Sequence, residues 1–197
     1  MKISEEIEYK KGAAKSLHQQ GRLAQDTGDL VEARRLYGES LKIAQKLVDK
    51  AGVASSLHNL GMLAQATGEV GEARRLYGES LKIAQELGDK SGVASSLHQL
   101  GMLAQDTGDL AEARRLYGDS LKIAQDLGDK SGVAITLAQT ARLEEHEGNL
   151  EKALDLIRQA EALFMELESP MAEKARYVRE RLEKRIAVEK KSDGNET

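Results

Sequence analysis

Three histidines, His18, His58 and His98, recur at intervals of forty residues, and this spacing raises the question of metal binding. Zinc needs three or four ligand atoms at about 2 Å, whereas packed helices that carry one histidine each would lie roughly 8–10 Å apart. The next position in the series is Ala138 instead of a fourth histidine. We therefore expect no metal site, and instead a row of polar side chains along a groove.

Arginine pairs follow the same period and could suggest phosphate binding. The pairs are Arg34-Arg35, Arg74-Arg75 and Arg114-Arg115. An acidic residue stands four positions after the second arginine of each pair, which is the spacing of ion pairs along a helix. The pattern favours a solvent-exposed network of ion pairs over an anion site.

Residues typical of catalysis are missing. Cysteine is absent, which excludes a thiolate nucleophile, a thiolate metal site and disulfides. The chain has no phosphate-binding loop and no Ser-His-Asp arrangement that the repeats would bring together. A repeat presents similar residues at intervals, whereas an active site needs different residues that converge. The sequence therefore predicts no enzyme and no cofactor.

The charge balance bears on the class of partner. Among 197 residues, 29 are Lys or Arg and 33 are Asp or Glu, which gives a net charge of −4. This mild acidity argues against nucleic acid, because phosphate contacts require a basic stripe. No stretch approaches the roughly 20 apolar residues of a membrane span, and residues 1–11 lack the apolar run of a signal peptide. We expect a soluble cytoplasmic protein that binds neither nucleic acid nor membrane.

The chain is organised around residues 54–93, because residues 94–133 repeat them with only seven substitutions. Self-similarity at this period indicates a solenoid, in which each unit buries its apolar face against its neighbours. The expected parts are a partial repeat or N-terminal helix at 1–13, four repeats at 14–53, 54–93, 94–133 and 134–173, a C-terminal capping helix at 170–191 and a disordered tail at 192–197. Residues 1–11 are expected to be the end of a helix whose earlier turns are missing, or a helix that caps the first repeat.

Each repeat is expected to split into two helices at a short turn. The turn glycines are Gly28, Gly68, Gly108 and Gly148. Glycine adopts the left-handed conformation that ends a helix, and Asp29, Asp109 and Asn149 are suitable N-caps for the next helix. A rotation of 100° per residue then gives the second helix a wide apolar arc and the first helix a narrower one. One face of the first helix remains, and we take it as the candidate binding surface.

The positions of Leu57, Leu60, Gly61, Ala73 and Tyr77 resemble the tetratricopeptide repeat, and the third unit has the same residues at these positions. The forty-residue length is similar to the longer variant of kinesin light chains, spindle-orientation adaptors and the sensor tails of bacterial signalling ATPases. The resemblance implies an all-α fold, a right-handed α-solenoid of helix-turn-helix repeats with a C-terminal capping helix.

Such repeats serve many partners, so function must be argued from the residues of the free face. We expect a scaffold that binds a peptide or helical segment of a partner protein on its concave face. The expected partner-binding residues are Arg22, Gln25, Ser55, His58, Asn59, Met62, Gln65, Ser95, His98, Gln99, Met102, Gln105 and Asp106.

Individual roles within this set differ. Met62 and Met102 stand at the centre of the polar face, where adaptable thioethers suggest recognition, unless each packs against a neighbouring helix. In the resembling adaptors an Asn at the position of Asn59 bonds the backbone of a bound peptide. A C-terminal carboxylate is not expected as ligand, because the positions where resembling clamps carry Lys or Arg hold His18, Ser95 and Gln99 here.

A second hypothesis is self-assembly. Near-identical units and an incomplete first helix suggest end-to-end docking of a homo-oligomer through the terminal helices, with Ile3 and Ile7 meeting an exposed repeat surface. Near-identity also leaves open a fragment of a longer array or an engineered consensus array.

Overall fold

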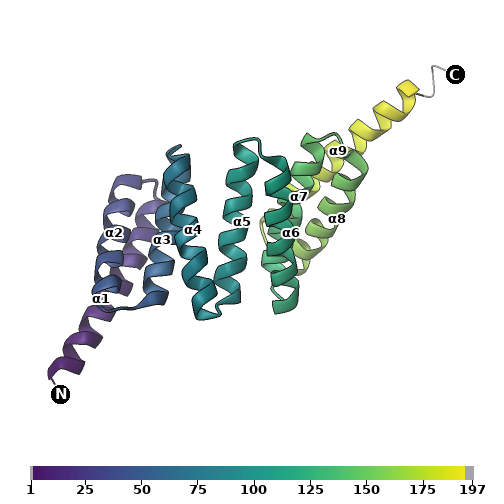
Figure 1. Cartoon of the computed structure of the whole chain (residues 1–197). Coiled ribbons are helices and arrows are strands. Elements are labelled where there is room, and N and C mark those ends of the chain that lie inside the picture. Colours follow the sequence, from purple (N-terminus) through teal and green to yellow (C-terminus); the bar gives the residue numbers. More distant parts are fainter. Residues whose placement is uncertain (1, 194–197) are drawn as a thin grey trace. The chain divides into compact units, whose positions relative to one another are not determined.

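The computed structural model describes residues 2–193, with the side chains of residues 5–190. The described residues form helices joined by short turns, without strands (Figure 1). The helices are α1 (Lys2–Asp26), α2 (Leu30–Lys46), α3 (Lys50–Ala66), α4 (Val70–Leu87), α5 (Lys90–Asp106), α6 (Leu110–Leu127), α7 (Lys130–His146), α8 (Leu150–Glu166) and α9 (Met171–Asp193). The chain divides after Leu103 into two compact units, here called unit 1 and unit 2.

Neighbouring helices pair within each unit. In unit 1, α1 packs on α2 and α3 packs on α4, while in unit 2, α8 packs on both α7 and α9 (Figure 1). Two helices per forty residues confirm the predicted all-α, helix-turn-helix architecture with a C-terminal helix. The helices that open the repeats begin at Lys50, Lys90 and Lys130, four residues before the repeat boundaries chosen from the sequence.

The turns within the repeats have the predicted backbone. Gly28, Gly68, Gly108 and Gly148 have φ angles of 83°, 78°, 82° and 82°. The carboxylates of Asp29 and Asp109 accept hydrogen bonds from the backbone N–H groups three residues later, at 3.0 and 3.2 Å. These bonds satisfy N–H groups that have no partner within the helix.

The turns between repeats use the same device, which the sequence analysis missed. Asp49, Asp89 and Asp129 accept from the N–H groups of the glycines three positions later. The residue before Asp89 is Gly88, with φ 67°, whereas the residue before Asp49 is Val48, with φ 55°. A β-branched residue in this left-handed region is strained, so Val48 holds an unfavourable conformation.

The first helix differs from expectation. We expected a helix to end near residue 11, but α1 runs without a break from Lys2 to Asp26. The position equivalent to the N-cap Asp49 is Tyr9, which cannot accept the capping hydrogen bond, so nothing interrupts the helix there. Tyr9 is 78% exposed and Ile7 39% exposed, whereas the side chain of Ile3 lies outside the described residues.

The two helices of a repeat approach each other where a tyrosine meets a glycine. In unit 1 the rings of Tyr37 and Tyr77 are fully buried against Gly21 and Gly61. A Cβ atom added to Gly61 would lie 2.7 Å from Tyr77 Cε1, which is too close for two carbon atoms. The glycine is therefore required for the ring to pack in this position.

A serine hydroxyl adds a polar bond between the same two helices. Ser40 Oγ donates to the backbone carbonyl of Ala14 at 2.9 Å, and Ser80 Oγ donates to that of Ala54 at 3.0 Å. Both serines are 4% exposed. Each hydrogen bond satisfies a hydroxyl that burial has removed from water.

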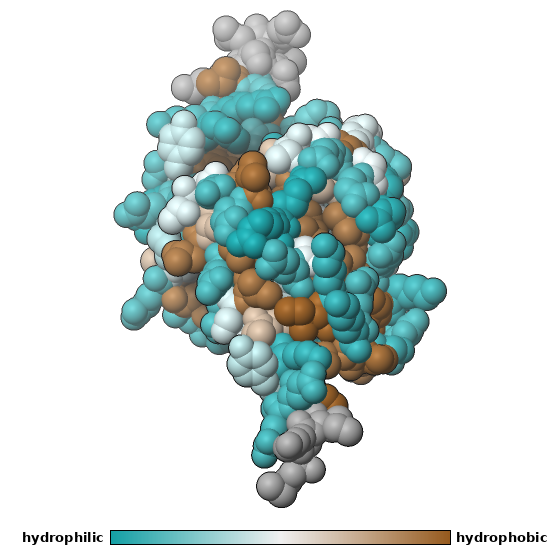
Figure 2. All heavy atoms as spheres, turned by 90° about the vertical axis from the view of Figure 1, so that its left-hand side faces the viewer, coloured by the Kyte–Doolittle hydropathy of each residue, from teal (hydrophilic) through white to brown (hydrophobic). Residues whose placement is uncertain are grey.

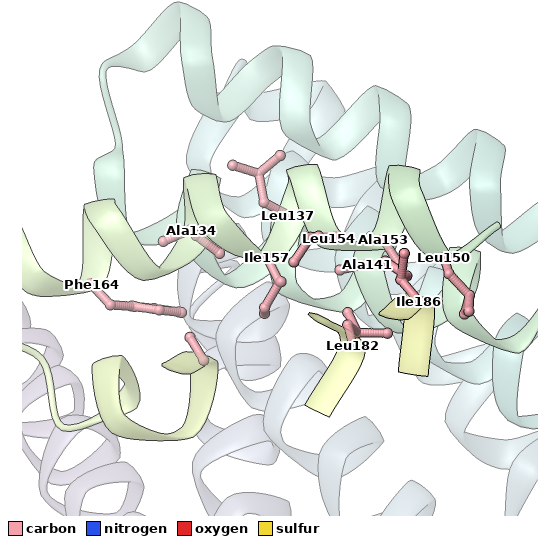
Figure 3. Close-up of a cluster of buried hydrophobic side chains, with 12 residues drawn as sticks. Ala134, Leu137, Ala141, Leu150, Ala153, Leu154, Ile157, Phe164, Leu182 and Ile186 are labelled. Atoms are coloured by element: carbon pink, nitrogen blue, oxygen red, sulfur yellow. The ribbon is translucent and has the colours of Figure 1, made fainter. Parts of the chain in front are cut away.

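The core of unit 2 lies around α8. Its buried side chains come from α7, α8 and α9, and Figure 3 shows Leu182 of α9 close to Ile157 of α8. Ala175, Leu182 and Ile186 are buried and Val178 packs against them, so α9 buries one apolar stripe. Of the predicted tail, Ser192 and Asp193 complete α9, and residues 194–197 lie outside the described part of the chain.

A buried carboxylate marks the last repeat. Glu144 is fully buried, and it accepts hydrogen bonds from Arg114, from Lys152 and, at 2.8 Å, from Asn149 Nδ2. Asn149 stands at the predicted N-cap of α8, but its side chain bonds Glu144 instead of capping the helix. Burial by itself raises the pKa of Glu144, but these hydrogen bonds outweigh it and lower the pKa to about 2.

The second arginine of each pair forms the predicted surface ion pair with the acidic residue four positions later. Arg35 contacts Glu32 and Glu39, both at 2.6 Å, and Arg34 reaches Glu69 in the next repeat at 2.5 Å. These side chains are 40–53% exposed, so solvent screens each ion pair and its contribution to stability is small. Figure 2 shows the side on which α1 and α2 lie, where hydrophilic side chains predominate.

None of the described helices is long and apolar enough to cross a membrane.

Alanine substitution at two glycines of unit 1 should change the unfolding free energy in opposite directions. Gly61→Ala forces a Cβ atom against the Tyr77 ring and should cost about 1–3 kcal/mol of unfolding free energy. Gly78 lies in the interior of α4, and a Cβ atom there meets nothing within 4 Å. Because alanine favours the helix more than glycine does, Gly78→Ala should raise the unfolding free energy by about 1 kcal/mol. Thermal and denaturant unfolding followed by circular dichroism measure both changes. Shifts of the same sign would contradict this packing.

Acid should weaken unit 2 through Glu144. Because its pKa is lowered in the folded state, its contribution is complete above about pH 4.5 and is lost as the pH falls toward 2. Glu144→Gln should lower the unfolding free energy by about 2 kcal/mol near neutral pH and by almost nothing at pH 2. Glu166→Gln, which removes an ion pair that is about half exposed, is the control and should cost less than about 1 kcal/mol. Hydrogen exchange of the α7 and α8 amides measures the stability of unit 2 in each variant as the pH is lowered. An equal loss of stability in Glu144→Gln and Glu166→Gln would refute the role of Glu144.

Candidate functional site

The candidate site is a hollow of 410 Å³ in unit 1, lined by α1, α3 and α5 together with parts of α4 and the turn that follows it. We call it the histidine groove and define it by His18, Arg22, Ser55, His58, Asn59 and Ser95. Five of these six residues belong to the predicted partner-binding set. They come together because each stands on the first helix of its repeat, and α1, α3 and α5 line the same hollow.

Aromatic and amide contacts hold the histidines. The ring centroids of His18 and Tyr37 are 5.3 Å apart, and those of His58 and Tyr77 are 5.6 Å apart. Asn59 Nδ2 donates to His18 Nε2 at 3.0 Å. Because an amide nitrogen only donates, Nε2 accepts and the neutral His18 ring carries its proton on Nδ1.

The environment keeps the histidines neutral. Burial lowers the pKa of His18 and His58, and the positive charge of Arg22 lowers that of His18 further. Burial and the neighbouring His58 lower the pKa of His98 to about 4. At neutral pH the row therefore offers uncharged nitrogen donors and acceptors.

One contact raises the question of catalysis. Ser95 Oγ lies 3.5 Å from His58 Nε2, at the outer limit of a hydrogen bond. Among the described residues no carboxylate bonds the other ring nitrogen of His58, so this contact lacks the third member of a nucleophilic triad. The described residues also contain no cluster of three or more metal-ligating side chains.

A buried hydroxyl in the wall of the groove was missed by the sequence analysis. Ser96 lines the hollow, is 1% exposed, and its Oγ has no hydrogen-bond partner. An unpaired buried hydroxyl costs about 1–3 kcal/mol, so it points to a bond that a ligand could supply. The Ser-Ser pairs at 55–56 and 95–96 were the sequence signal that could have indicated this hydroxyl.

A second hollow of 590 Å³ continues along α1 and shares His18, Arg22 and Ser55 with the first.

The predicted glutamines have a structural role that the sequence analysis did not anticipate. Gln25 Oε1 and Gln65 Oε1 accept hydrogen bonds from the hydroxyls of Tyr37 and Tyr77 at 3.0 Å. In unit 2, Gln105 bonds Tyr117 in the same way, at 2.9 Å. Each glutamine thus links the core tyrosine of its repeat to the surface of the first helix.

Met62 does not stand on an open polar face. It is half-buried and packs against the core cluster that contains Leu57 and Tyr77. Leu63, next to it, is completely buried, because α3 has neighbours on two sides and not on one. The free face of the first helices is therefore narrower than the periodicity indicated. Met102 is half-buried as well.

The remaining predicted residues lie on α5. His98 and Gln99 are half-buried, in unit 1. Asp106 is exposed and belongs to unit 2, where its charge adds to the effect of burial in raising the pKa of Tyr117. The hollows described here include none of these three side chains.

Comparison with known families agrees with this geometry. The sequence profile of the tetratricopeptide repeat matches residues 12–86 and 92–166, which together make up most of the chain. The chain belongs to the tetratricopeptide repeat family. The Gly61–Tyr77 contact and its equivalent at Gly21 and Tyr37 are thus the glycine and aromatic positions of the tetratricopeptide pattern.

Solved structures of similar fold include three proteins from different organisms. The BtubC (BKLC) protein of P. vanneervenii is 18% identical, with 95% of this chain and 93% of that chain covered and a TM-score of 0.65. A putative kinesin light chain of Podosopora anserina with nearly identical TPR-like repeats is 21% identical, with 91% and 90% covered and a TM-score of 0.70. Aspartyl phosphate phosphatase F of Bacillus subtilis is 7% identical, with 83% and 43% covered and a TM-score of 0.77.

These likenesses establish the tetratricopeptide fold and nothing about partners, because the identities are low. A search of curated protein sequences finds no match to this chain. The function must therefore be argued from the groove itself.

His98 should titrate far below an ordinary histidine. Its pKa of about 4 means that it stays neutral until the solution is strongly acidic, since burial penalises the charged ring. By linkage, the stability that depends on neutral His98 is complete above about pH 6.5 and is lost as the pH falls toward 4. Two-dimensional NMR of the histidine Cε1–H groups, with His98→Gln for assignment, measures the titration. A midpoint near 6.5 would show that the ring is solvated.

Proposed function

We infer that this tetratricopeptide repeat protein is a binding scaffold whose histidine groove holds an extended segment of a partner protein. The family supports the general role, because its repeats present long surfaces to other chains. The finer assignment rests on the side chains of unit 1.

The groove suits a peptide backbone because its polar groups are mostly uncharged. Histidine, asparagine and serine side chains supply hydrogen-bond donors and acceptors in a hollow of 410 Å³. An extended peptide presents N–H and C=O groups that need such partners, whatever its side chains are. The charged residues of the lining are Arg22 and Asp89, and Asp89 already accepts a hydrogen bond from the N–H of Gly92 at 3.0 Å. A segment without a large net charge is therefore favoured.

The unpaired hydroxyl of Ser96 is the observation that carries this proposal. In the preceding repeat the equivalent Ser56 Oγ donates to Ser40 Oγ at 3.4 Å, whereas Ser96 Oγ has no such partner. A carbonyl or amide group of a bound segment would complete its hydrogen bonding and regain the cost of burial.

Peptide-display selection on the full chain tests the proposal. We expect enriched peptides whose affinity falls about tenfold for Asn59→Ala, which corresponds to the loss of one good hydrogen bond. Ser95→Arg, which places a long charged side chain in the hollow, should abolish binding. Ser16→Arg is the matched control, because Ser16 is an exposed serine of α1 outside the two hollows.

Circular dichroism checks that each variant keeps its helicity. Enriched peptides that bind Ser95→Arg and the native chain equally well would place binding elsewhere. A selection that enriches no peptide would equally argue against a role in peptide binding.

A further inference from the structure

Unit 2 has a groove of its own that differs in chemistry from the histidine groove. A hollow of 670 Å³ lies between α7, α8 and α9. We call it the cap groove and define it by Arg142, Ile157, Phe164, Lys174, Val178 and Arg181. Its volume is within the range of about 300–1,000 Å³ that is usual for binding pockets.

The floor of the cap groove is apolar and is part of the packed core of unit 2. Ile157 and Phe164 are 3% and 2% exposed, and both belong to the core cluster of α7, α8 and α9 (Figure 3). Above these two buried side chains, the apolar surface that remains accessible comes from Val178, which is half-buried, and from Met171 at the start of α9, which is 39% exposed. Apolar surface at the base of a hollow gains free energy when an apolar partner covers it.

The rim is cationic. The lining contains four arginine or lysine side chains and one carboxylate, on a chain whose net charge is −4. That carboxylate, Glu145, is already paired with Arg181 at 2.5 Å and lies 3.8 Å from Arg185. Arg142 and Lys174 have no ion pair with any acidic side chain of unit 2 that the structure describes. The rim therefore carries positive charge that an anionic partner could neutralise.

The spacing of the charges indicates the shape of that partner. Lys174, Arg181 and Arg185 follow one side of α9 over eleven residues, which at 1.5 Å per residue is about 16 Å, or roughly three helical turns. A small anion would leave the apolar floor uncovered, whereas a helix with one apolar face and acidic flanks would engage the floor and the rim together.

We propose that the cap groove binds an acidic amphipathic helix of a partner protein, with the apolar face of that helix on Met171 and Val178 and its carboxylates on Arg142 and Lys174. This site is separate from the proposed function, since it lies in unit 2 and uses charge and apolar surface where the histidine groove uses neutral hydrogen bonds. The chain would then recognise two segments of different character.

Fluorescence anisotropy with the full chain tests this inference. The probe is a labelled synthetic helix of roughly three turns, with leucine at positions i, i+4 and i+7 and glutamate elsewhere. One control peptide has lysine in place of each glutamate, and a second has alanine in place of each leucine. We expect binding of the first peptide alone, with an affinity that falls as salt is added.

Charge reversals on α9 locate the site. Lys174→Glu should weaken binding about tenfold or more, because it places a like charge beside the bound carboxylates. Lys184→Glu is the matched control on the same helix, since Lys184 is an exposed lysine outside the groove lining, and it should change the affinity less than about threefold. Both lysines are exposed, so neither reversal disturbs the core, and thermal unfolding verifies this.

Several results would overturn the inference. No binding of the acidic helix, or equal weakening by both reversals, would mean that no specific site exists. Weakening by Arg22→Glu instead of Lys174→Glu would assign binding to the histidine groove. Light scattering that reveals self-association, lost in Lys174→Glu, would show that a second copy of the chain occupies the groove instead of a partner helix.

Discussion

The contact between a tyrosine ring and a glycine backbone is the constraint on which the rest of each repeat depends. In unit 1, Tyr77 is fully buried against Gly61, at a separation that leaves no room for a Cβ atom. Close packing of this kind sets how near the two helices of a repeat lie. The Ser80 hydroxyl bond to the Ala54 carbonyl then joins the same two helices at a second level.

The same ring connects the core to the candidate binding surface. The Tyr77 hydroxyl donates to Gln65 Oε1, and the centroid of the His58 ring lies 5.6 Å from that of the Tyr77 ring, with the two planes tilted by 57°. His58 in turn lines the histidine groove, half-buried and neutral. Side chains that rest on a packed tyrosine keep a single orientation, so under the proposed function they would lose little conformational freedom on binding.

The turns and helix caps within a repeat were predictable from the sequence, whereas the contacts between helices were only partly predictable. The left-handed glycines and the caps at Asp29 and Asp109 follow from short-range spacing, whereas the contact of Gly61 with Tyr77 on the next helix was not predicted. Met62 was placed on an open face because helical periodicity assigns faces without counting neighbours, and α3 has more than one. The cap groove was missed because Phe164, Arg142 and Lys174 come from three helices and share no motif.

Sequence separation of the polar contacts bears on how the chain folds. Hydrogen bonds within a repeat join residues 26 apart, as for Ser40 and Ala14, and those between repeats join residues such as Arg34 and Glu69, 35 apart, or His18 and Asn59, 41 apart. Short loops cost little entropy to close, and low contact order speeds folding. Nucleation can then begin at any well-capped helix pair and spread to its neighbours, so cooperativity extends only as far as adjacent repeats hold together.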